Sequence, residues 1–369
     1  MASMKAVGVS TYGPVNNFQS RDIPKPGEPT GRDVLVKEVL NPQSFYFSNN
    51  IDRVKACSVN PIDTKIRGGT YDDAPDYYEH APQGFHVIGY DGAGTILEVG
   101  PDVTRFKVGD DISWVGATTR QGSYAEYQLV SEFLCCKKPE NLDFVEAASY
   151  GLTFGTAYQS LNHRLEIKPN EDAGILIING GGGVGSAAIQ LARNVLHLPV
   201  VIATASRPDT ATSCKRMGAT HVVNHREDLV EEIKALKLDV PIKYAYVLAP
   251  TEQYVHAIAK ICAPFSKVCT IVQADIRLYG TEFMSKSMTF SWDWLGTAAF
   301  HHSNVESYHE IFKTLGNLMS EGKLFPTLNQ RYKLTLENLK QAHRQIESKA
   351  TIGKIGLGVE EPGEGTPFA

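Results

Sequence analysis

The chain has 369 residues, with 42% hydrophobic residues, 21% charged residues and a formal net charge of −5. This length fits two domains, and the composition is ordinary for a globular protein. The acidic balance argues against a nucleic-acid partner, and no apolar run reaches the roughly 20 residues that a membrane-spanning helix needs. Without a recognisable signal or transit peptide, the sequence predicts a cytoplasmic protein with no membrane partner. Six cysteines without a CxxC pair predict reduced thiols.

The first 140 or so residues predict short strands separated by glycine-containing turns. This pattern is carried by DVLVKEV (33–39), GYDGAGTILEVG (89–100), VGDDISWVG (108–116) and GSYAEYQLV (122–130). Many short strands with frequent turns are typical of a small β-barrel or sandwich. Apolar residues at helical spacing over 144–161 then mark a change of structure.

After Pro169 the sequence alternates between strand-like and helix-like segments. ILIIN (175–179) is a continuous apolar run, as expected of a strand buried on both faces of a parallel sheet. The alternation continues through VGSAAIQLARNVL (184–196), LPVVIATA (198–205), PDTATSCKRMGA (208–219), THVVN (220–224), DLVEEIKALK (228–237), KYAYVLA (243–249), EQYVHAIAKIC (252–262) and SKVCTIV (266–272). It predicts a doubly wound parallel sheet of the Rossmann type.

The C-terminal part of the chain returns to a different pattern. ENLKQAHRQIES (337–348) predicts an amphipathic helix, and GKIGLGV (353–359) predicts a closing strand. We expect this segment to rejoin the N-terminal domain. The predicted fold class is therefore α/β, with a barrel-like substrate domain over 1–147 and 303–369 and a Rossmann domain over 148–302.

A glycine loop follows the first strand of the predicted Rossmann domain. Gly180, Gly182 and Gly185 satisfy G-x-G-x-x-G, and Gly183 and Val184 complete the loop. The motif follows a strand and opens a helix, which is the context that it requires. Without Cβ atoms the backbone can approach a pyrophosphate, and the helix N-terminus supplies N–H groups. We interpret these five residues as a dinucleotide site rather than as a merely flexible loop.

The end of the second strand selects the cofactor. NAD-binding proteins place an Asp or Glu about 20 residues after the glycines, whereas this chain has Ser206 and Arg207. A hydroxyl and a guanidinium suit a 2′-phosphate, so the sequence predicts NADPH. The alternative is that Arg207 is a solvated surface charge, which is also our interpretation of Lys215 and Arg216.

Six segments together resemble one known family. They are SVNPIDTKIRGG (58–69), IGYDGAGTILEVG (88–100), INGGGGVGSAAIQLAR (178–193), VIATASRP (201–208), MGATHVVNHRE (217–227) and GKIGL (353–357). They resemble the medium-chain dehydrogenases/reductases, within these the quinone oxidoreductase branch, and most closely its zinc-type alcohol dehydrogenase-like subgroup. The resemblance implies a GroES-like catalytic domain, a Rossmann domain, NADPH and a homodimer. MTFSW (288–292) alternates as the pairing edge strand of such a dimer would.

One segment departs from the family pattern. Relatives carry a single strand where this chain inserts LNPQSFYFSNNIDRV (40–54). The insertion is either an extra surface loop that splits the strand or a gene-model artefact.

The resemblance also raises the question of zinc. At the ligand positions of zinc-dependent relatives this chain has Asn60, Tyr90 followed by Asp91, and Leu152. Asn and Leu cannot supply thiolates, and Tyr is a poor substitute for His. Residues 100–130 contain no cysteine for a structural zinc site, and the pair His301 and His302 lacks further ligands. We predict no metal, and we expect this histidine pair at the surface.

The remaining chemistry is hydride delivery to an already activated acceptor, because no Lewis acid is available to polarise an alcohol. Tyr71, 11 residues after Asn60, matches the tyrosine that related enoyl thioester reductases use as proton donor. The resemblance thus implies that Tyr71 stabilises a developing oxyanion, although a core or rim tyrosine is the alternative. Asn60 either orients the substrate through its amide or is structural, and Asp63 is expected to fix the local loop. Phe290, Trp292 and Trp294 either wall the acceptor pocket or pack in a core or dimer interface.

Three functions fit these observations. The first is a zinc-independent, NADPH-dependent reductase of a small quinone or α,β-unsaturated carbonyl substrate. The second is a trans-acting enoyl-thioester reductase of the polyketide type, with a carrier protein as partner. The third is a non-catalytic NADPH-binding protein, for which the acidic charge argues against RNA as a partner.

Overall fold

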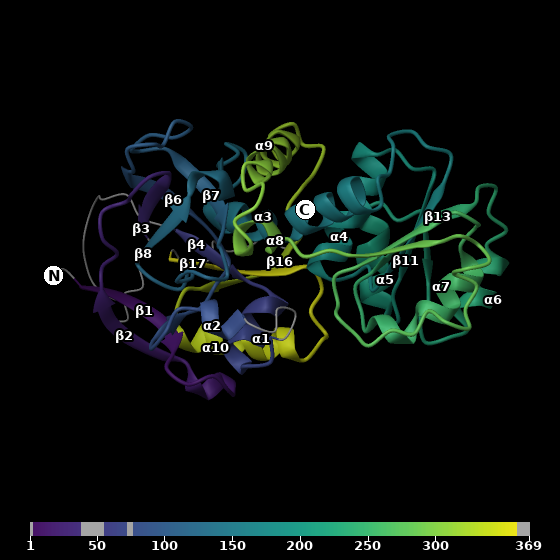
Figure 1. Cartoon of the computed structure of the whole chain (residues 1–369), viewed down its shortest axis with the longest axis horizontal. Helices are drawn as coiled ribbons and strands as arrows, with labels where there is room; N and C mark the ends of the chain where they lie inside the picture. The colour runs from purple at the N-terminus through teal and green to yellow at the C-terminus, as the bar shows by residue number, and fades with distance from the viewer. Residues whose placement is uncertain (1–2, 38–54, 72–76, 360–369) are drawn as a thin grey trace. The chain divides into compact units, whose positions relative to one another are not determined.

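A computed structural model describes residues 3–37, 55–71 and 77–359 of the chain. The chain divides into two compact units, of which the first comprises Met1–Leu152 and Gly296–Ala369 and the second Thr153–Leu295 (Figure 1). The predicted insertion at 40–54 lies outside the described residues. Among the described residues, no helix is both long and apolar enough to cross a membrane.

The first unit is built mainly from short strands, as its alternating, turn-rich sequence predicts. Its described strands are β1 (Ser3–Val9), β2 (Gln19–Pro24), β3 (Asp33–Lys37), β4 (Ala56–Val59), β5 (His86–Val87), β6 (Asp91–Val99), β7 (Asp111–Val115), β8 (Tyr127–Ser131), β9 (Cys135–Lys137), β16 (Leu328–Lys333) and β17 (Lys354–Gly358). They form a sheet in the order β2-β1-β5 and a larger sheet in the order β16-β17-β4-β6-β3-β8, to which β7 and β9 attach through β6.

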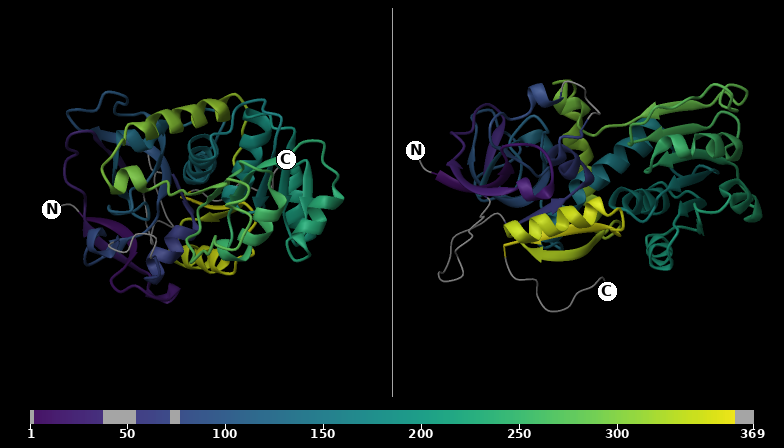
Figure 2. Two further views of the ribbon diagram at one scale, coloured as in Figure 1. Left: turned by 45° about the vertical axis from the view of Figure 1, so that its right-hand side comes forward. Right: turned by 90° about the horizontal axis from the view of Figure 1, so that it is seen from below.

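Helices border these sheets. They are α1 (Pro61–Gly68), α2 (Tyr77–His80), α8 (Thr297–Phe300), α9 (Ser307–Ser320) and α10 (Leu336–Glu347), while α3 (Phe144–Gln159) begins in the first unit and ends in the second. In α10 the buried positions Leu339, Ala342 and His343 recur every three or four residues, which gives the helix one apolar face. Figure 2 shows this helix lying beside the strands β16 and β17.

The C-terminal segment completes the first unit, as the sequence predicts. Strand β17 pairs antiparallel with β4, with Ile355 opposite Val59 and Leu357 opposite Cys57. Every side chain of β17 is buried, so the strand lies inside the unit and is not an edge addition. The second unit is therefore an insertion between the two sequence segments of the first.

The second unit contains a six-stranded sheet among the described residues, and every pairing in it is parallel. Its elements are β10 (Gly174–Ile178), α4 (Gly183–Gln190), β11 (Val200–Thr204), α5 (Pro208–Arg216), β12 (His221–Val223), α6 (Leu229–Ala235), β13 (Ile242–Val247), α7 (Val255–Ile261), β14 (Lys267–Thr270) and β15 (Thr289–Trp292). The strand order β12-β11-β10-β13-β14-β15 is that of the Rossmann fold. The prediction of a doubly wound parallel sheet is confirmed.

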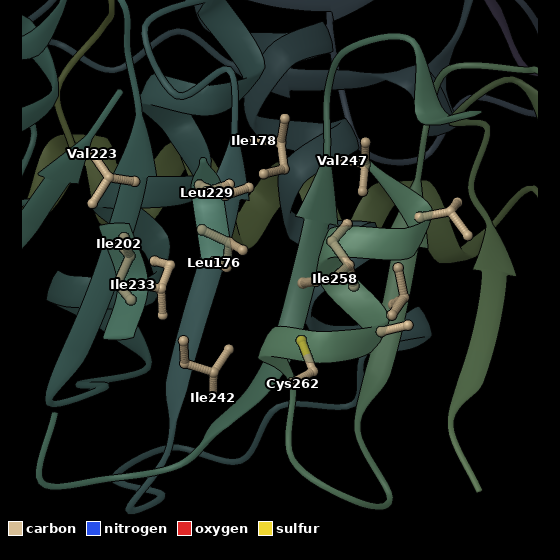
Figure 3. Packing of buried hydrophobic residues seen from close by; sticks show 14 of the residues in the cluster. Leu176, Ile178, Ile202, Val223, Leu229, Ile233, Ile242, Val247, Ile258 and Cys262 are labelled. Carbon is tan, nitrogen blue, oxygen red and sulfur yellow. The ribbon is translucent and has the colours of Figure 1, made fainter. Parts of the chain in front are cut away.

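The core of the second unit explains why its strands are continuous apolar runs. All five residues of β10 and of β11 are buried, because helices cover both faces of the sheet. Figure 3 shows Leu229 and Ile233 of α6 and Ile258 of α7 packed over side chains such as Leu176 and Ile202. Full burial of each such side chain contributes about 1.5–3 kcal/mol.

All six cysteines are buried and none forms a disulfide. The prediction of reduced thiols is confirmed.

Candidate active site

The glycine loop lies between β10 and α4 in the second unit, and two of its glycines are required for packing. A Cβ atom on Gly180 would lie 2.7 Å from the Cβ of Ala203, on the neighbouring strand β11. A Cβ atom on Gly185 would lie 2.6 Å from the carbonyl oxygen of Gly180. The first glycine therefore allows the loop to pass β11, and the last allows α4 to pack against the loop.

Gly182 differs from these two glycines, because a Cβ atom there would meet no atom within 4 Å. Gly182 is also the residue that precedes α4, which begins at Gly183. The N–H groups of Gly183, Val184 and Gly185 have no acceptor within the helix, since the first turn cannot supply one. Open space beside a helix N-terminus is what an approaching pyrophosphate needs, so the loop fits a dinucleotide.

Ser206 and Arg207 follow the end of β11, and both are partly exposed. The Nε atom of Arg207 lies 3.2 Å from the Oγ1 of Thr210 and 3.7 Å from a carboxylate oxygen of Asp209. The Arg207 side chain is 38% exposed, and that of Asp209 is 67% exposed. An ion pair this exposed is weak, so the guanidinium can bind an added phosphate. Lys215 and Arg216 are exposed, as predicted.

Sequence reasoning missed a second polar segment at this edge of the sheet. Strand β12 runs parallel to β11 with Val223 opposite Thr204, so the residues after both strands meet at one edge. The Nδ1 atom of His225 lies 3.1 Å from the Thr204 hydroxyl, and the exposed Arg226 follows it. Burial, and then the charge of Arg226, lower the pKa of His225. The parallel sheet order could have identified Arg226 as a further cation at the same edge of the sheet as Arg207.

In the first unit, one buried lysine organises the surroundings of Asn60. The Nζ atom of Lys354 lies 3.0 Å from the Val59 carbonyl oxygen, 2.5 Å from the Asn60 Oδ1 and 3.5 Å from the Asp91 Oδ2. An ammonium group has three N–H donors, and three acceptors surround it here. Its side chain is 3% exposed and that of Asp91 is fully buried.

Asp91 and Asn60 are equally constrained. The Asp91 Oδ1 accepts from the Ser58 hydroxyl at 2.7 Å and from the Ser58 N–H at 3.2 Å. The Asp91 Oδ2 accepts from the Asn60 Nδ2 at 3.0 Å as well as from Lys354. Both ends of the Asn60 amide are therefore engaged within the protein. That Asn60 orients the substrate stays a prediction, and it would require one of these bonds to be exchanged.

Asp63 fixes the local backbone, as expected. Its Oδ2 accepts from the Asn60 N–H at 2.6 Å, which caps the start of α1, and from the Tyr124 hydroxyl at 3.3 Å. Burial, and then the neighbouring Asp91, raise the pKa of the Asp63 carboxyl to about 8. At neutral pH the Asp63 carboxyl is therefore largely protonated.

Tyr71 lies buried beside a group of phenols. Its ring contacts that of Tyr77 edge to face, with ring centroids 5.0 Å apart, and its N–H donates to the Tyr78 hydroxyl at 3.1 Å. The Tyr77 hydroxyl in turn lies 3.2 Å from that of Tyr90. Burial raises the pKa of both Tyr77 and Tyr90, so these phenols are protonated donors at neutral pH.

The other residues that the sequence singled out are three aromatic side chains of the second unit and two histidines of the first. Phe290 packs partly buried against the core of the second unit, and Trp292, on the same strand β15, is 44% exposed. The Trp294 carbonyl accepts a 3.4 Å hydrogen bond from Gln159, and Trp294 is partly buried. His301 and His302 are exposed, which confirms their expected surface location.

Comparisons with known proteins place this chain in a family. The family described as zinc-binding dehydrogenase matches residues 217–357, and the alcohol dehydrogenase GroES-like domain matches residues 51–140. A zinc-type alcohol dehydrogenase-like protein of Staphylococcus aureus (strain COL) is 36% identical over 313 residues, covering 83% of this chain and 90% of the relative. The quinone oxidoreductase of Lama guanicoe is 30% identical over 358 residues, covering 96% of this chain and 97% of the relative.

The chain belongs to the medium-chain dehydrogenase/reductase superfamily. Within it, the chain falls in the zinc-type alcohol dehydrogenase-like and quinone oxidoreductase branch, as the sequence motifs predict. The solved structure of a candidate zinc-dependent alcohol dehydrogenase protein from Rhizobium etli CFN 42 has a TM-score of 0.84 and 35% identity, covering 97% of this chain and 98% of that one. The GroES-like domain and the Rossmann sheet are confirmed, and this medium-chain reductase is an NAD(P)-dependent oxidoreductase.

The glycine loop of this medium-chain reductase generates the first prediction. Gly182→Ala should leave the melting temperature unchanged, because the added methyl enters open space, but should weaken dinucleotide binding roughly tenfold or more by blocking the approach of the pyrophosphate. Calorimetric titration with NADPH and thermal unfolding measure the two effects. Gly185→Ala is the matched control and should lower the melting temperature, because its methyl collides with the Gly180 carbonyl. Unchanged dinucleotide affinity in Gly182→Ala would contradict the assigned role.

Proposed function

We propose that this protein is a zinc-independent, NADPH-dependent reductase that delivers hydride to a quinone or an α,β-unsaturated carbonyl compound. The observation that carries the proposal is the bonding of the residues at the metal-ligand positions. There Asp91 is held by a buried lysine and Ser58, and Tyr90 is bonded to another phenol. This environment offers neutral donors to an oxyanion instead of ligands to a cation.

Zinc independence is supported by the side chains at the ligand positions and by the pairing of Asp91 with Lys354. The family description mentions zinc, yet Asn60 and Leu152, at positions that the resemblance aligns with zinc ligands, carry no thiolate. Zinc would have to displace the Lys354 ammonium from the Asp91 carboxylate. Within the ranges that the structure describes, no cluster of three or more His, Cys, Asp or Glu side chains could hold a metal ion.

NADPH is supported by the electrostatics at the end of β11. Ser206 and Arg207 stand where NAD-dependent proteins carry an acid, and Arg226 adds a second cation at the same edge of the sheet. A 2′-phosphate would gain charge-assisted hydrogen bonds there. Gly180, Gly182, Gly183, Val184 and Gly185 would hold the pyrophosphate.

The chemistry divides between cofactor and protein. NADPH, when bound, supplies the hydride. The protein binds the acceptor and stabilises the negative charge that develops on its carbonyl oxygen. Tyr71 is our candidate donor to that oxygen, since a phenol hydroxyl can donate a hydrogen bond and its ring lies against that of Tyr77. Asn60 then acts by holding Lys354 and Asp91 in place.

We further propose that the protein is a cytoplasmic homodimer that acts on a small molecule. Strand β15 forms one edge of the described Rossmann sheet and exposes Trp292, which supports pairing with a second copy through this strand. Six free thiols are typical of a reducing compartment and support the location.

Metal content tests the first part of the proposal. The purified protein should contain well below one zinc per chain by elemental analysis, and chelators should leave its NADPH oxidation rate unchanged. Asn60 and Leu152 cannot supply the thiolates that bind zinc, and the Lys354 ammonium is paired with the Asp91 carboxylate. One tightly held zinc per chain would contradict the proposal.

Arg207→Ala tests the cofactor preference. The charge-assisted hydrogen bonds lost are worth roughly 1.5–3 kcal/mol, or about ten- to a hundredfold in NADPH affinity. NADH affinity should barely change, because NADH has no phosphate at this position. Calorimetry with both cofactors measures the effect, and the exposed, more distant Lys215→Ala serves as control. Equal binding of NADH and NADPH by the unaltered protein would refute the preference.

Tyr71→Phe tests the donor and, with it, the reaction class. NADPH oxidation is first measured against quinones, enones and enoyl thioesters. Losing an oxyanion donor costs about 2.7–4 kcal/mol, so enone turnover should fall roughly a hundred- to a thousandfold. The loss with quinones should be smaller, because their reduction can draw a proton from water. Enone reduction at the unaltered rate would make Tyr71 a packing residue.

A further inference from the structure

Four titratable side chains of the first unit form a continuous line of hydrogen bonds that the proposed reaction does not yet use. The Tyr12 hydroxyl lies 3.1 Å from the His86 Nδ1, and the His86 Nε2 lies 3.3 Å from the Tyr90 hydroxyl. The Tyr90 hydroxyl lies 3.2 Å from that of Tyr77, which donates to the Thr118 carbonyl oxygen at 2.8 Å. The line starts at a partly exposed phenol and leads to three buried groups.

The carbonyl at the inner end fixes the direction of every bond. A carbonyl oxygen only accepts, so the single proton of Tyr77 points to Thr118. Tyr77 must then accept from Tyr90, and Tyr90, having given its proton, must accept from the His86 Nε2. His86 therefore carries its proton on Nε2, and its bare Nδ1 accepts from Tyr12. All donors point inward from the surface.

We propose that Tyr12, His86, Tyr90 and Tyr77 are a proton relay that supplies the reduction of an α,β-unsaturated carbonyl acceptor. The inference rests on the proposed function, and it extends that function by naming the source of the proton. Hydride addition to the β-carbon leaves an enolate that needs one proton. The inner end of the relay, Tyr77, lies against the ring of Tyr71, our candidate donor to that enolate.

The transfer balances in atoms and charge. While Tyr71 holds the enolate oxygen by a hydrogen bond, the Tyr77 proton passes to the enolate, the Tyr90 proton to Tyr77, and the His86 Nε2 proton to Tyr90. The Tyr12 proton passes to the His86 Nδ1, and Tyr12 takes a proton from water, which becomes hydroxide as the enolate is neutralised. Each relay group thus gives and receives one proton and keeps its charge. His86 changes tautomer, and reorientation of the ring and hydroxyls restores the starting state.

The surroundings keep the line neutral, as a relay of this type requires. Burial lowers the pKa of His86 to about 4, so its imidazole is uncharged at neutral pH. Burial raises the pKa of Tyr12, Tyr77 and Tyr90, and among the described residues Tyr71, Tyr78 and Asp63 are further titratable groups close to these phenols. Asp63 is itself mostly protonated at neutral pH. Each side chain in the line can both donate and accept a hydrogen bond. If these positions served packing alone, phenylalanine would be sufficient.

Tyr12→Phe tests the relay at its outer end and keeps the ring that packs on Tyr78. Enone turnover at saturating NADPH should fall roughly tenfold or more, because positioned proton transfer contributes about a hundred- to ten-thousandfold and stray water restores part of the supply. Quinone turnover should stay within about twofold. Tyr332→Phe is the control, since it removes a hydrogen-bonded phenol hydroxyl of the same unit whose partners, Gln330 and Gln345, take no part in the line. Equal enone turnover in the two variants overturns the relay.

A second measurement needs no substrate. In protein labelled with 15N-histidine, and with the His86→Gln variant to assign the signal, His86 should be neutral with its proton on Nε2 at pH 7. A proton on Nδ1, or a charged imidazole, overturns the relay even in an active enzyme. If the unaltered chain reduces quinones but no enone, the relay is overturned, whereas if it reduces neither, the proposed function fails. The Nε2 tautomer would then still support the proposed direction of the hydrogen bonds. Failure of the relay and failure of the proposed function can therefore be distinguished.

Discussion

A single ammonium group, that of Lys354, joins parts of the first unit that are far apart in the sequence. It comes from the last described strand and bonds to the end of β4, to Asn60 and to Asp91 at the start of β6. Removing one partner of such a buried pair typically costs 3–5 kcal/mol, because the other charge is left uncompensated. The position of β17, the start of α1 and the orientation of Asp91 all depend on this contact.

The same contact determines which chemistry the first unit can offer. A carboxylate that is neutralised by lysine and two hydrogen bonds from Ser58 has little capacity left for a cation. Around it stand protonated phenols, together with a carboxyl whose pKa burial raises. The site thus favours the stabilisation of an anion by neutral donors. In the second unit, the open space at Gly182 and the guanidinium of Arg207 likewise favour an anionic ligand.

The sequence predicts the fold of this protein more completely than the site. Continuous apolar runs such as ILIIN and their alternation with helices imply the parallel sheet, because each strand is buried on both faces. GKIGL (353–357) was rightly expected to close the first unit. The relay from Tyr12 to Tyr77 could not be predicted, since its members are brought together only by tertiary packing. The engagement of Asn60 by Lys354 was missed for the same reason, because 294 residues separate the partners.

The discontinuity of the first unit has a consequence for the order of folding. The second unit is one uninterrupted stretch of chain, so it can fold as soon as it has been synthesised. The first unit must wait, because β4 obtains its partner β17 only when nearly the whole chain exists. Until then β4 presents an unpaired, apolar edge that is open to wrong pairing. Closing so long a loop is entropically slow, so the lifetime of this exposed edge during synthesis sets the aggregation risk of the protein.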